Sequence, residues 1–288
     1  MRPTISILHA TFHNRPSPLD VKKCWLERAE RPDLIEYIFA MDADDEATLL
    51  ETEGQPRIVS PPGEGEVTAV RNWNAAAMMS SNDLLVVIAD DLSPPQAWDT
   101  ALTKMIGPLD AAVVPFAIKV ADSPFVDDTL LRHPVVSRAF YRRFGLFSND
   151  YRGVYCDNDI TLRAFWQSVI LDGRSLYLEH RHPAFHAKVT WTESQHRINN
   201  PLDYQRGRAV FEATWSHRHR LAQIRLVPVV GRTPLSEERL HALQRRNRTL
   251  EMVVYPYRRV KVMLAEWLFP ARGSAQKMGH QKNFSREA

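Results

Sequence analysis

The chain has 288 residues, of which 44% are hydrophobic and 25% charged, a composition typical of a globular protein with one large or two small domains. No apolar run reaches the roughly 18 residues of a membrane span, and the N-terminal stretch lacks a signal-peptide cleavage pattern. Two cysteines, Cys24 and Cys156, exclude a disulfide framework and a cysteine metal cluster, which favours a cytoplasmic location.

The net charge of +3 is spread unevenly along the chain. Residues 216–288 carry fifteen Lys and Arg against five Asp and Glu, whereas residues 1–215 carry 22 against 29. A basic C-terminal part favours an anionic partner such as a membrane surface, a nucleic acid or an acidic glycan. The alternative is an ordinary solvated helix that is rich in arginine.

Strand-like and helix-like patterns alternate over the first half of the chain, and after a less regular stretch over residues 119–149 a further helix and strand follow. The helix near the N-terminus has Ser17 as its expected N-cap and Pro18 at its first position. We expect strands over residues 4–11, 34–42, 57–62, 83–91, 111–118 and 174–182, and helices over residues 17–31, 64–81, 94–107 and 156–173. Strands separated by helices predict an α/β fold with a mostly parallel central sheet whose two faces are covered.

The C-terminal part follows a different pattern. Leucines, valines and aromatic residues recur at three- and four-residue spacing from Ser236 to Leu268, which predicts a long amphipathic helix interrupted near Pro256. We therefore expect one domain over residues 1–215 and a basic helical extension over residues 216–288, with a mobile tail. The helix could lie on the inner face of a membrane, or its apolar stripe could pack on the body or on a second copy of the chain.

Acidic and imidazole side chains follow several of the predicted strands. In open α/β sheets, ligands bind beyond the carboxyl ends of the strands. The residues found there are Asp42, Asp90, Asp91, His180, His182 and His186. Carboxylate oxygens with an imidazole suit Mg²⁺ or Mn²⁺ held together with a diphosphate. The absence of a glycine-rich phosphate loop from the sequence argues against a Rossmann dehydrogenase and a P-loop enzyme.

Four segments between Thr4 and His186 carry a family resemblance when taken in order. They are TISILHATFHNRP, IEYIFAMDADDEA, VRNWNAAAMMSSNDLLVVIADDLSPPQAW and YCDNDITLRAF. The set resembles inverting glycosyltransferases of the GT-A fold, close to the large family two. The resemblance implies a GT-A-type sheet and Mn²⁺- or Mg²⁺-dependent transfer of a sugar, of the hexosyltransferase type. The donor would be a nucleotide diphosphate sugar, with a UDP-sugar favoured, and the acceptor hydroxyl would belong to a glycan, lipid, protein or nucleic acid.

The resemblance also assigns roles to single residues. It implies that Asp91 binds the metal ion with one histidine, in the order of preference His182, His180, His186. It implies that Asp157 is the base that deprotonates the acceptor, with Asp159 as its competitor. The donor nucleotide would meet Thr11, Phe12, Asn14, Arg15, Asp42, Arg71, Asn74 and Asp90, with Asn72 as a weaker candidate.

Three positions depart from the family pattern. Ala89 stands where many relatives have the first acid of the D-x-D motif, and Cys156 stands where a glutamate usually precedes the base. Asn74 replaces the usual glycine after Arg71. Two other functions therefore stay open: a nucleotidyltransferase or sugar-nucleotide hydrolase on the same fold, and a non-catalytic binding module with the basic helix as its contact surface.

Overall fold

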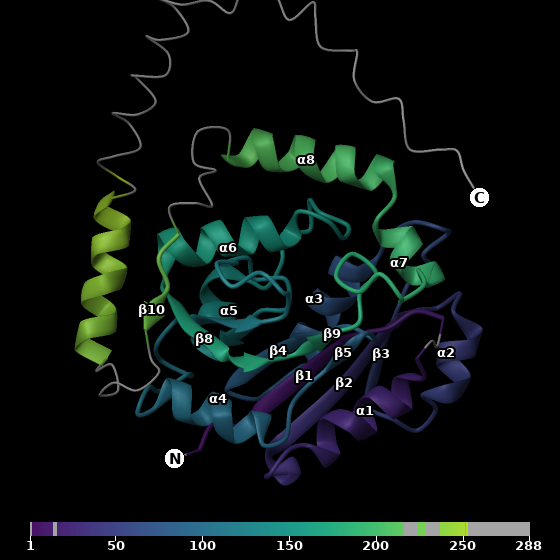
Figure 1. Cartoon of the computed structure of the whole chain (residues 1–288), viewed down its shortest axis with the longest axis horizontal. Coiled ribbons are helices and arrows are strands. Elements are labelled where there is room, and N and C mark those ends of the chain that lie inside the picture. The colour runs from purple at the N-terminus through teal and green to yellow at the C-terminus, as the bar shows by residue number, and fades with distance from the viewer. Residues whose placement is uncertain (1, 14–15, 216–223, 229–236, 251, 253–288) are drawn as a thin grey trace, which may run out of the picture. The chain divides into compact units, whose positions relative to one another are not determined.

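The computed structural model describes residues 2–13, 16–215, 224–228, 237–250 and 252 (Figure 1). The chain divides into two compact units, Met1–Arg248 and Thr249–Ala288. Residues 216–223, directly after the predicted boundary at 215/216, lie outside the described residues, and so does the part of the predicted helix beyond residue 252.

An eight-stranded sheet with the order β10-β8-β6-β7-β4-β1-β2-β3 forms the centre of the first unit. All its neighbouring strands are parallel except at β7, which runs antiparallel to both β4 and β6. The mostly parallel α/β sheet predicted from the sequence is therefore confirmed. Its strands are β1 (Ile5–Ala10), β2 (Ile35–Asp42), β3 (Arg57–Ser60), β4 (Leu84–Ile88), β6 (Ala117–Ala121), β7 (Val135–Ser137), β8 (Ile170–Tyr177) and β10 (Val227–Pro228). A separate antiparallel pair is formed by β5 (Leu92–Ser93) and β9 (Glu179–His180).

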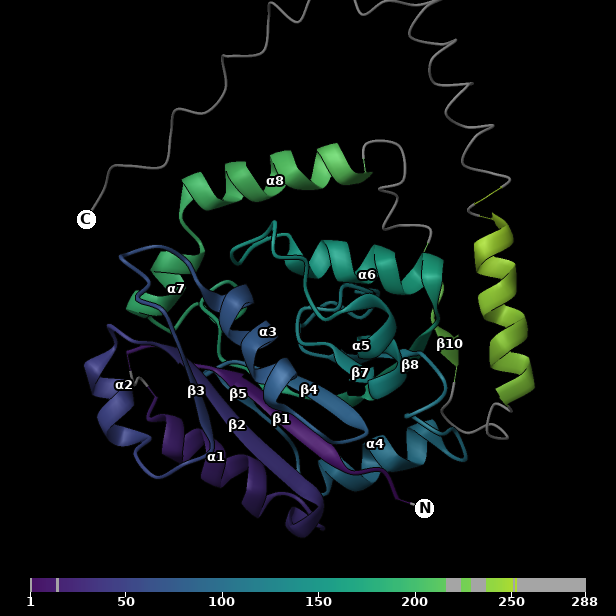
Figure 2. The ribbon, with the colours of Figure 1, turned by 180° about the vertical axis from the view of Figure 1, so that it is seen from behind.

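Helices contribute to two hydrophobic cores, one on each face of the sheet (Figures 1 and 2). One core contains residues of α1 and α4, and the other contains residues of α3, α5, α6 and α8. The helices are α1 (Pro18–Glu27), α2 (Glu46–Glu51), α3 (Ala69–Met79), α4 (Trp98–Ile106), α5 (Arg138–Phe144), α6 (Cys156–Gln167), α7 (Glu193–Ile198) and α8 (Pro201–Trp215), with a short 3₁₀ helix, η1 (Pro32–Leu34). As predicted, the side chain of Ser17 caps α1 by accepting from the Asp20 N–H.

The continuous apolar run of β4 follows from these two cores. Leu84, Val86 and Ile88 belong to the core that contains α1 and α4. Leu85 and Val87 belong to the opposite core. Because successive side chains of a strand point to opposite faces, a strand covered on both faces has no position that favours a polar residue.

The sequence prediction was wrong at the end of one helix. The helix expected over residues 156–173 ends at Gln167, and residues 170–173 open β8 instead. Ile170 and Leu171 are fully buried and pair with Ala117 and Ile118 of β6. Sheet pairing thus overrides the local helical pattern there. The strand expected over residues 111–118 likewise begins only at Ala117.

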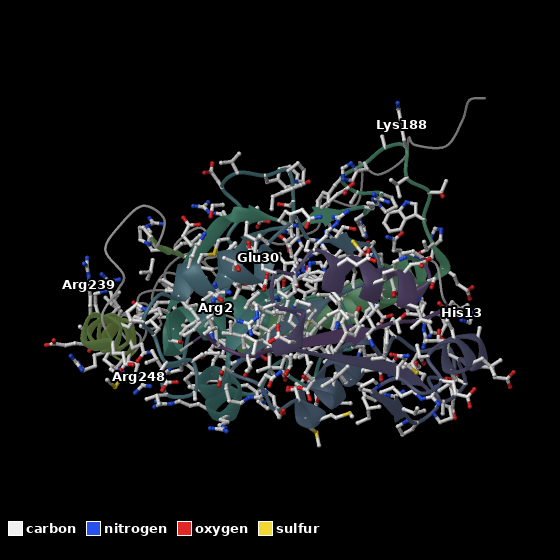
Figure 3. All side chains as sticks on the ribbon, turned by 90° about the horizontal axis from the view of Figure 1, so that it is seen from below. Arg2, His13, Glu30, Lys188, Arg239 and Arg248 are labelled. Carbon is white, nitrogen blue, oxygen red and sulfur yellow. The ribbon has the colours of Figure 1, made fainter. Side chains whose placement is uncertain are left out.

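The C-terminal helix is described over residues 237–250, and its residues 237–248, which belong to the first unit, pack on the body of that unit. Leu240 is fully buried in the core that contains α4, and the Gln244 amide donates to the Pro115 carbonyl at 2.7 Å. One turn later, the Asn247 amide donates to the Phe165 carbonyl at 2.9 Å. Arg239 and Arg248 carry basic groups on the same helix (Figure 3). Within the described residues, no helix is both long enough and apolar enough to cross a membrane.

Replacing Leu240 with alanine should lower the free energy of unfolding by about 2–5 kcal/mol, because it leaves a cavity in the core. Urea denaturation followed by circular dichroism measures the change. Leu250 is on the same helix but 40% exposed, so Leu250→Ala is the matched control and should cost less than about 0.5 kcal/mol. Equal effects of the two substitutions would contradict the packing described for this helix.

Candidate active site

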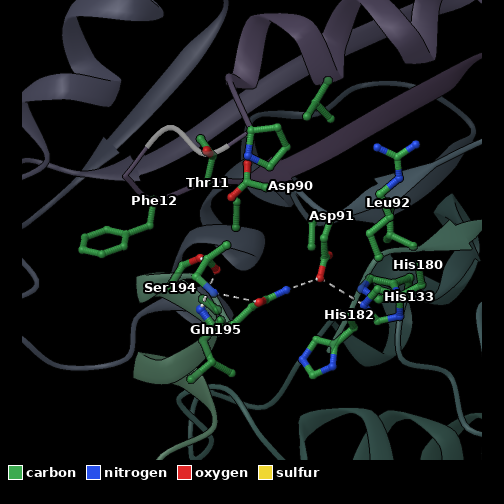
Figure 4. Close-up of a pocket in the computed structure, with 18 of the residues that line it drawn as sticks. Thr11, Phe12, Asp90, Asp91, Leu92, His133, His180, His182, Ser194 and Gln195 are labelled. Carbon is green, nitrogen blue, oxygen red and sulfur yellow. Dashed lines mark hydrogen bonds and ion pairs between the residues drawn. The ribbon is translucent and has the colours of Figure 1, made fainter. Parts of the chain in front are cut away.

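A cavity of about 700 Å³ lies at the carboxyl ends of the parallel strands β1 and β4 (Figure 4). Its wall also includes residues of α1, the start of α3, His133, residues 180–182 and the segment 189–199, which contains α7. Neither α7 nor α8 was predicted, although Thr192 and Gln195 form a capping box that the sequence TESQ signals. The cavity is at the edge of the sheet where a ligand site was expected.

Asp90 and Asp91 both line this cavity, and their side chains have different partners. The Asp91 Oδ2 atom lies 3.3 Å from His180 Nε2 and accepts a hydrogen bond of 2.8 Å from the Gln195 amide. Burial alone would raise the pKa of Asp91, but the neighbouring imidazoles of His180 and His133, which carry positive charge when protonated, and the hydrogen bond from Gln195 lower it well below its ordinary value. Asp91 is therefore held as a carboxylate.

The ring of His180 is oriented by the Asp122 backbone. Its Nδ1 atom lies 3.1 Å from the Asp122 carbonyl, which can only accept a hydrogen bond, so Nδ1 carries a proton. In the neutral ring, the lone pair is then on Nε2, the atom that faces Asp91. A backbone carbonyl behind an imidazole is the arrangement commonly found around metal-bound histidines.

A second imidazole, which was not predicted, lines the cavity beside His180. The His133 ring packs edge to face against the His180 ring at 5.0 Å, and its Nδ1 lies 3.1 Å from Asp122 Oδ2. Burial lowers the pKa of His133 although Asp122 opposes this effect. Asp122 is itself buried and pairs with Lys119 Nζ at 2.6 Å. One aspartate thus orients both rings, through its carboxylate and through its carbonyl.

The other two predicted histidines are placed less favourably for a metal ion. His182 lines the cavity, but its Nδ1 accepts a hydrogen bond from the Ala184 N–H at 3.2 Å. In the neutral ring, the proton is then on Nε2, which leaves no free lone pair. His186 is exposed and does not line the cavity. The geometry favours His180 over His182, which is the reverse of the order expected from the sequence.

Asp90 is part of a chain of hydrogen bonds that runs into the sheet. Its Oδ1 atom lies 2.8 Å from His9 Nε2, and His9 Nδ1 lies 2.8 Å from the hydroxyl of Tyr37. His9 is fully buried and Tyr37 nearly so. Neither residue was singled out in the sequence, although a histidine within the apolar run of β1 was a signal of a buried polar contact.

Three side chains of the cavity wall carry buried polar atoms without a hydrogen bond. They are the Thr11 hydroxyl, the Asn72 carbonyl oxygen, and the Nε and one Nη of Arg197. Asn72 donates its amide to Asp42 Oδ1 at 2.9 Å, and since a carboxylate only accepts, the Asn72 oxygen is the atom left without a partner. Arg197 stacks on the ring of Phe12 at 4.3 Å. Buried unpaired polar atoms around a cavity favour a polar ligand there.

Several predicted donor-binding residues support the cavity wall but do not line it. Asp42 is buried beneath Thr68, Arg71 and Asn72, which all bond to its carboxylate. Arg71 also donates to the Pro61 carbonyl. Asn74 bonds to the backbone of Phe147 and to Asn149. Of the predicted opening loop, Thr11 and Phe12 line the cavity, whereas Asn14 and Arg15 lie outside the described residues.

The two acids at the start of α6 lie in different surroundings. Asp159 is buried: its Oδ1 accepts from the Trp215 indole at 2.8 Å, and its Oδ2 pairs with Arg163 at 2.8 Å. Asp157 is half-buried, and burial raises its pKa. A helix N-terminus by itself lowers the pKa of a nearby carboxyl group, but burial outweighs that effect at Asp157. Neither acid lines the cavity, and both oxygens of Asp159 are already engaged.

Removing the Asp159 carboxylate should therefore destabilise the fold. Asp159→Ala leaves the partly buried guanidinium of Arg163 without its acid, and we expect a loss of about 3–5 kcal/mol in the free energy of unfolding. Urea denaturation measures it. Asp127 is an exposed acid, so Asp127→Ala is a suitable control and should change stability by less than about 0.5 kcal/mol. If both variants were equally stable, Asp159 would not have the structural role that its contacts indicate.

No protein-family model and no curated protein matches the sequence. Among solved structures, the chain is similar to the TarS protein of S. aureus in complex with UDP, with 11% identity and a TM-score of 0.44, over 57% of this chain and 55% of that one. It is also similar to the mannosyltransferase PcManGT of Pyrobaculum calidifontis in complex with GDP-Man and Mn²⁺, with 13% identity and a TM-score of 0.46, over 93% and 86% of the two chains.

A third similar structure is the glucosyl-3-phosphoglycerate synthase of Mycobacterium tuberculosis with Mn²⁺, UDP-glucose and phosphoglyceric acid, with 16% identity and a TM-score of 0.43, over 74% and 79% of the two chains. Since every one of these TM-scores is below 0.5, the case for an activity rests on the residues of the cavity.

Proposed function

We propose that this protein is a divalent-cation-dependent inverting glycosyltransferase that moves a sugar from a nucleotide diphosphate sugar to an acceptor hydroxyl. The observation that carries the proposal is the pair formed by Asp91 Oδ2 and His180 Nε2, 3.3 Å apart, in a cavity that also presents Asp90. The same cavity contains polar atoms of Asn72 and Arg197 that make no hydrogen bond. A carboxylate–imidazole pair beside donors and acceptors for a nucleotide is what such a donor requires.

The donor set fits a hard divalent ion such as Mn²⁺ or Mg²⁺. Asp91 would offer a carboxylate oxygen, and His180 would offer Nε2, whose lone pair is left free by the bond from Nδ1 to the Asp122 carbonyl. Within the described residues, no group of three or more His, Cys, Asp or Glu is placed to hold a metal ion. We propose that oxygens of the donor diphosphate complete the coordination. When bound, the ion would neutralise negative charge on the departing diphosphate.

Asp157 is the stronger candidate for the base, because the oxygens of Asp159 are bonded to Trp215 and Arg163. In the reaction, the acceptor oxygen forms a bond to the anomeric carbon while the bond from that carbon to the diphosphate oxygen breaks. Asp157 takes the proton of the acceptor hydroxyl. A carboxyl group whose pKa is raised by burial binds that proton more strongly than an exposed one, which suits a general base.

The donor nucleotide would be held on the side of the cavity formed by Thr11, Phe12, Asn72 and Arg197. Phe12 offers an aromatic face, and Arg197 offers a positive charge with N–H groups that make no hydrogen bond. Asp42 supports this wall by holding Asn72 and, at 3.6 Å, Arg197. We propose a UDP-sugar as donor, with a glycan, lipid, protein or nucleic acid as acceptor.

Isothermal titration of UDP, GDP and dTDP, each with and without Mn²⁺, tests the proposal directly. We expect at least one of them to bind about tenfold or more tightly with the ion, and incubation with the matching nucleotide sugars to release the nucleoside diphosphate when an acceptor is present. Release of a nucleoside monophosphate or of free sugar without an acceptor would instead indicate a nucleotidyltransferase or hydrolase. If no nucleotide bound with or without Mn²⁺, the non-catalytic alternative would replace this proposal.

A further inference from the structure

His9 occupies a position of β1 where an apolar residue is expected. It follows Ile5 and Ile7 on the face of the strand that packs in the core with α1 and α4, and its side chain is fully buried. An imidazole without hydrogen bonds would be costly there. Each ring nitrogen of His9 therefore needs a hydrogen-bond partner in that core.

Both ring nitrogens have partners, and the partners determine the tautomer. Asp90 Oδ1, 2.8 Å from Nε2, accepts hydrogen bonds when ionised, so Nε2 carries the proton. In the neutral ring, Nδ1 then accepts a hydrogen bond from the Tyr37 hydroxyl, 2.8 Å away. Tyr37 is buried, and burial raises its pKa, so its hydroxyl stays protonated and remains the donor. Both nitrogens of the His9 ring thus have a hydrogen-bond partner in the chain from Tyr37 to Asp90.

The imidazole ring is fixed in place by its neighbours. The Tyr37 ring lies edge to face with it at 5.7 Å, and the Phe39 ring lies against it at 5.5 Å. All three residues come from the adjacent strands β1 and β2, which are rigid elements. Asp90 itself lies in the connection after β4, where a side chain without such a partner would have several rotamers.

We propose that His9 is a positioning residue: its Nε2–H, held by Tyr37, binds Oδ1 of Asp90 so that the other carboxylate oxygen is presented to a hydroxyl of the ligand in the cavity. The geometry of the chain stands on the contacts above, whereas the identity of the ligand as a nucleotide rests on the proposed function. A fixed carboxylate oxygen that accepts from a hydroxyl would favour ribose over deoxyribose. His9 would then determine selectivity without contacting the ligand.

The tautomer of His9 can be measured without any ligand. In protein labelled with ¹⁵N-histidine, we expect one ring with a protonated Nε2 and an Nδ1 that accepts a hydrogen bond, together with a ring N–H proton at low field. These signals should vanish in His9→Gln, which assigns them, and the N–H signal should move in Asp90→Asn. A proton on Nδ1 of His9, or a ring signal unaffected by Asp90→Asn, would overturn the proposal.

The second measurement uses whichever of UDP and GDP the wild-type protein binds, and its 2′-deoxy and 3′-deoxy forms. His9→Leu removes the N–H donor, and we expect the preference for ribose over at least one deoxy form to fall by about tenfold, the effect of losing a buried hydrogen bond to a charged group. His9→Gln keeps an N–H within reach of Asp90 and should restore most of the preference. Tyr37→Phe removes only the hydroxyl and should have a smaller effect.

The double variant His9→Leu/Tyr37→Phe leaves no unpaired hydroxyl in the core, so it replaces His9→Leu if that variant does not fold. An unchanged ribose preference in the folded variant would overturn the proposal. Failure of the proposed function is a different result: the wild-type protein would bind none of the nucleotides. The ring tautomer, measured on the free protein, would then decide for or against the positioning role of His9.

Discussion

Replacing Asp91 with asparagine is expected to abolish the effect of Mn²⁺ on nucleotide binding and to lower the rate of sugar transfer by at least about a thousandfold. In the proposed site, Asp91 is one of the two side chains that would hold the ion, and its pKa well below the ordinary value keeps it ionised at neutral pH. A divalent ion contributes several kcal/mol to stabilising charge on a leaving diphosphate, and each 1.4 kcal/mol corresponds to a factor of ten in rate. The amide keeps the size of the side chain but loses its charge.

Titration of nucleotide with and without Mn²⁺, and the rate of nucleoside diphosphate release, measure this effect. Asp127→Asn changes an exposed acid outside the cavity and should leave both quantities unchanged. Gln195→Ala should weaken nucleotide binding less than Asp91→Asn, because it removes a hydrogen bond to Asp91 and leaves the carboxylate in place. An Asp91→Asn variant that keeps its Mn²⁺-stimulated binding and its rate would exclude Asp91 as a metal ligand.

The central sheet could be predicted because its signals are local. The run from Leu84 to Ile88 is apolar at every position, and only a strand covered on both faces buries such a run. Ser17 and Pro18 mark the start of α1 by a cap and a fixed backbone angle, which are also local. The end of α6 could not be predicted in this way, since Ile170 pairs with Ala117, more than fifty residues earlier in the sequence.

The site could be predicted only in part, for a similar reason. The sequence order places Asp90 and Asp91 after a central strand, and the topology then brings them to the cavity. The sequence around Asp91 does not predict that Gln195 of α7 binds its carboxylate. It also does not predict that His133 lies beside His180. The choice between His180 and His182 depends on which backbone group meets Nδ1, a carbonyl in one case and an N–H in the other. These contacts form only in the folded chain, so the sequence alone does not predict them.

Asp157→Asn should change the rate of sugar transfer and the free energy of unfolding in opposite directions, lowering the first and raising the second. Removing a general base lowers a rate by about 10²–10⁴-fold. The introduced asparagine side chain would be neutral, as is the protonated acid that burial favours, and its oxygen can still accept from the Asn158 N–H. We therefore expect a much slower transfer together with a higher free energy of unfolding at pH 7.

The pH dependence gives the sharper test. Burial raises the pKa of Asp157, and the negative charge of Asp122 adds to this effect. The hydrogen bond from the Asn158 N–H and the positive charge of Arg132 oppose it. Cys156 and Tyr204 are also close enough for the charge of Asp157 to raise their pKa values. The folded protein binds the proton of Asp157 more tightly than the unfolded chain does. Protonated Asp157 therefore contributes fully to the free energy of unfolding below the ordinary pKa of aspartate, about 4, and this contribution is lost as the pH rises through the raised pKa of the folded protein.

The free energy of unfolding of Asp157→Asn should accordingly exceed that of the wild-type protein by more and more as the pH rises through that range. The two values should approach each other in acid, and urea denaturation at several pH values measures the difference. In the wild-type protein, the rate of transfer should fall on the acid side at a pH above that of an ordinary aspartate, because the base must be ionised to accept the proton. Asp127→Asn, at an exposed position, should show neither effect. A variant Asp157→Asn that is less stable than the wild-type protein at pH 7 yet retains its rate would remove Asp157 as the base and leave it a structural role at the start of α6.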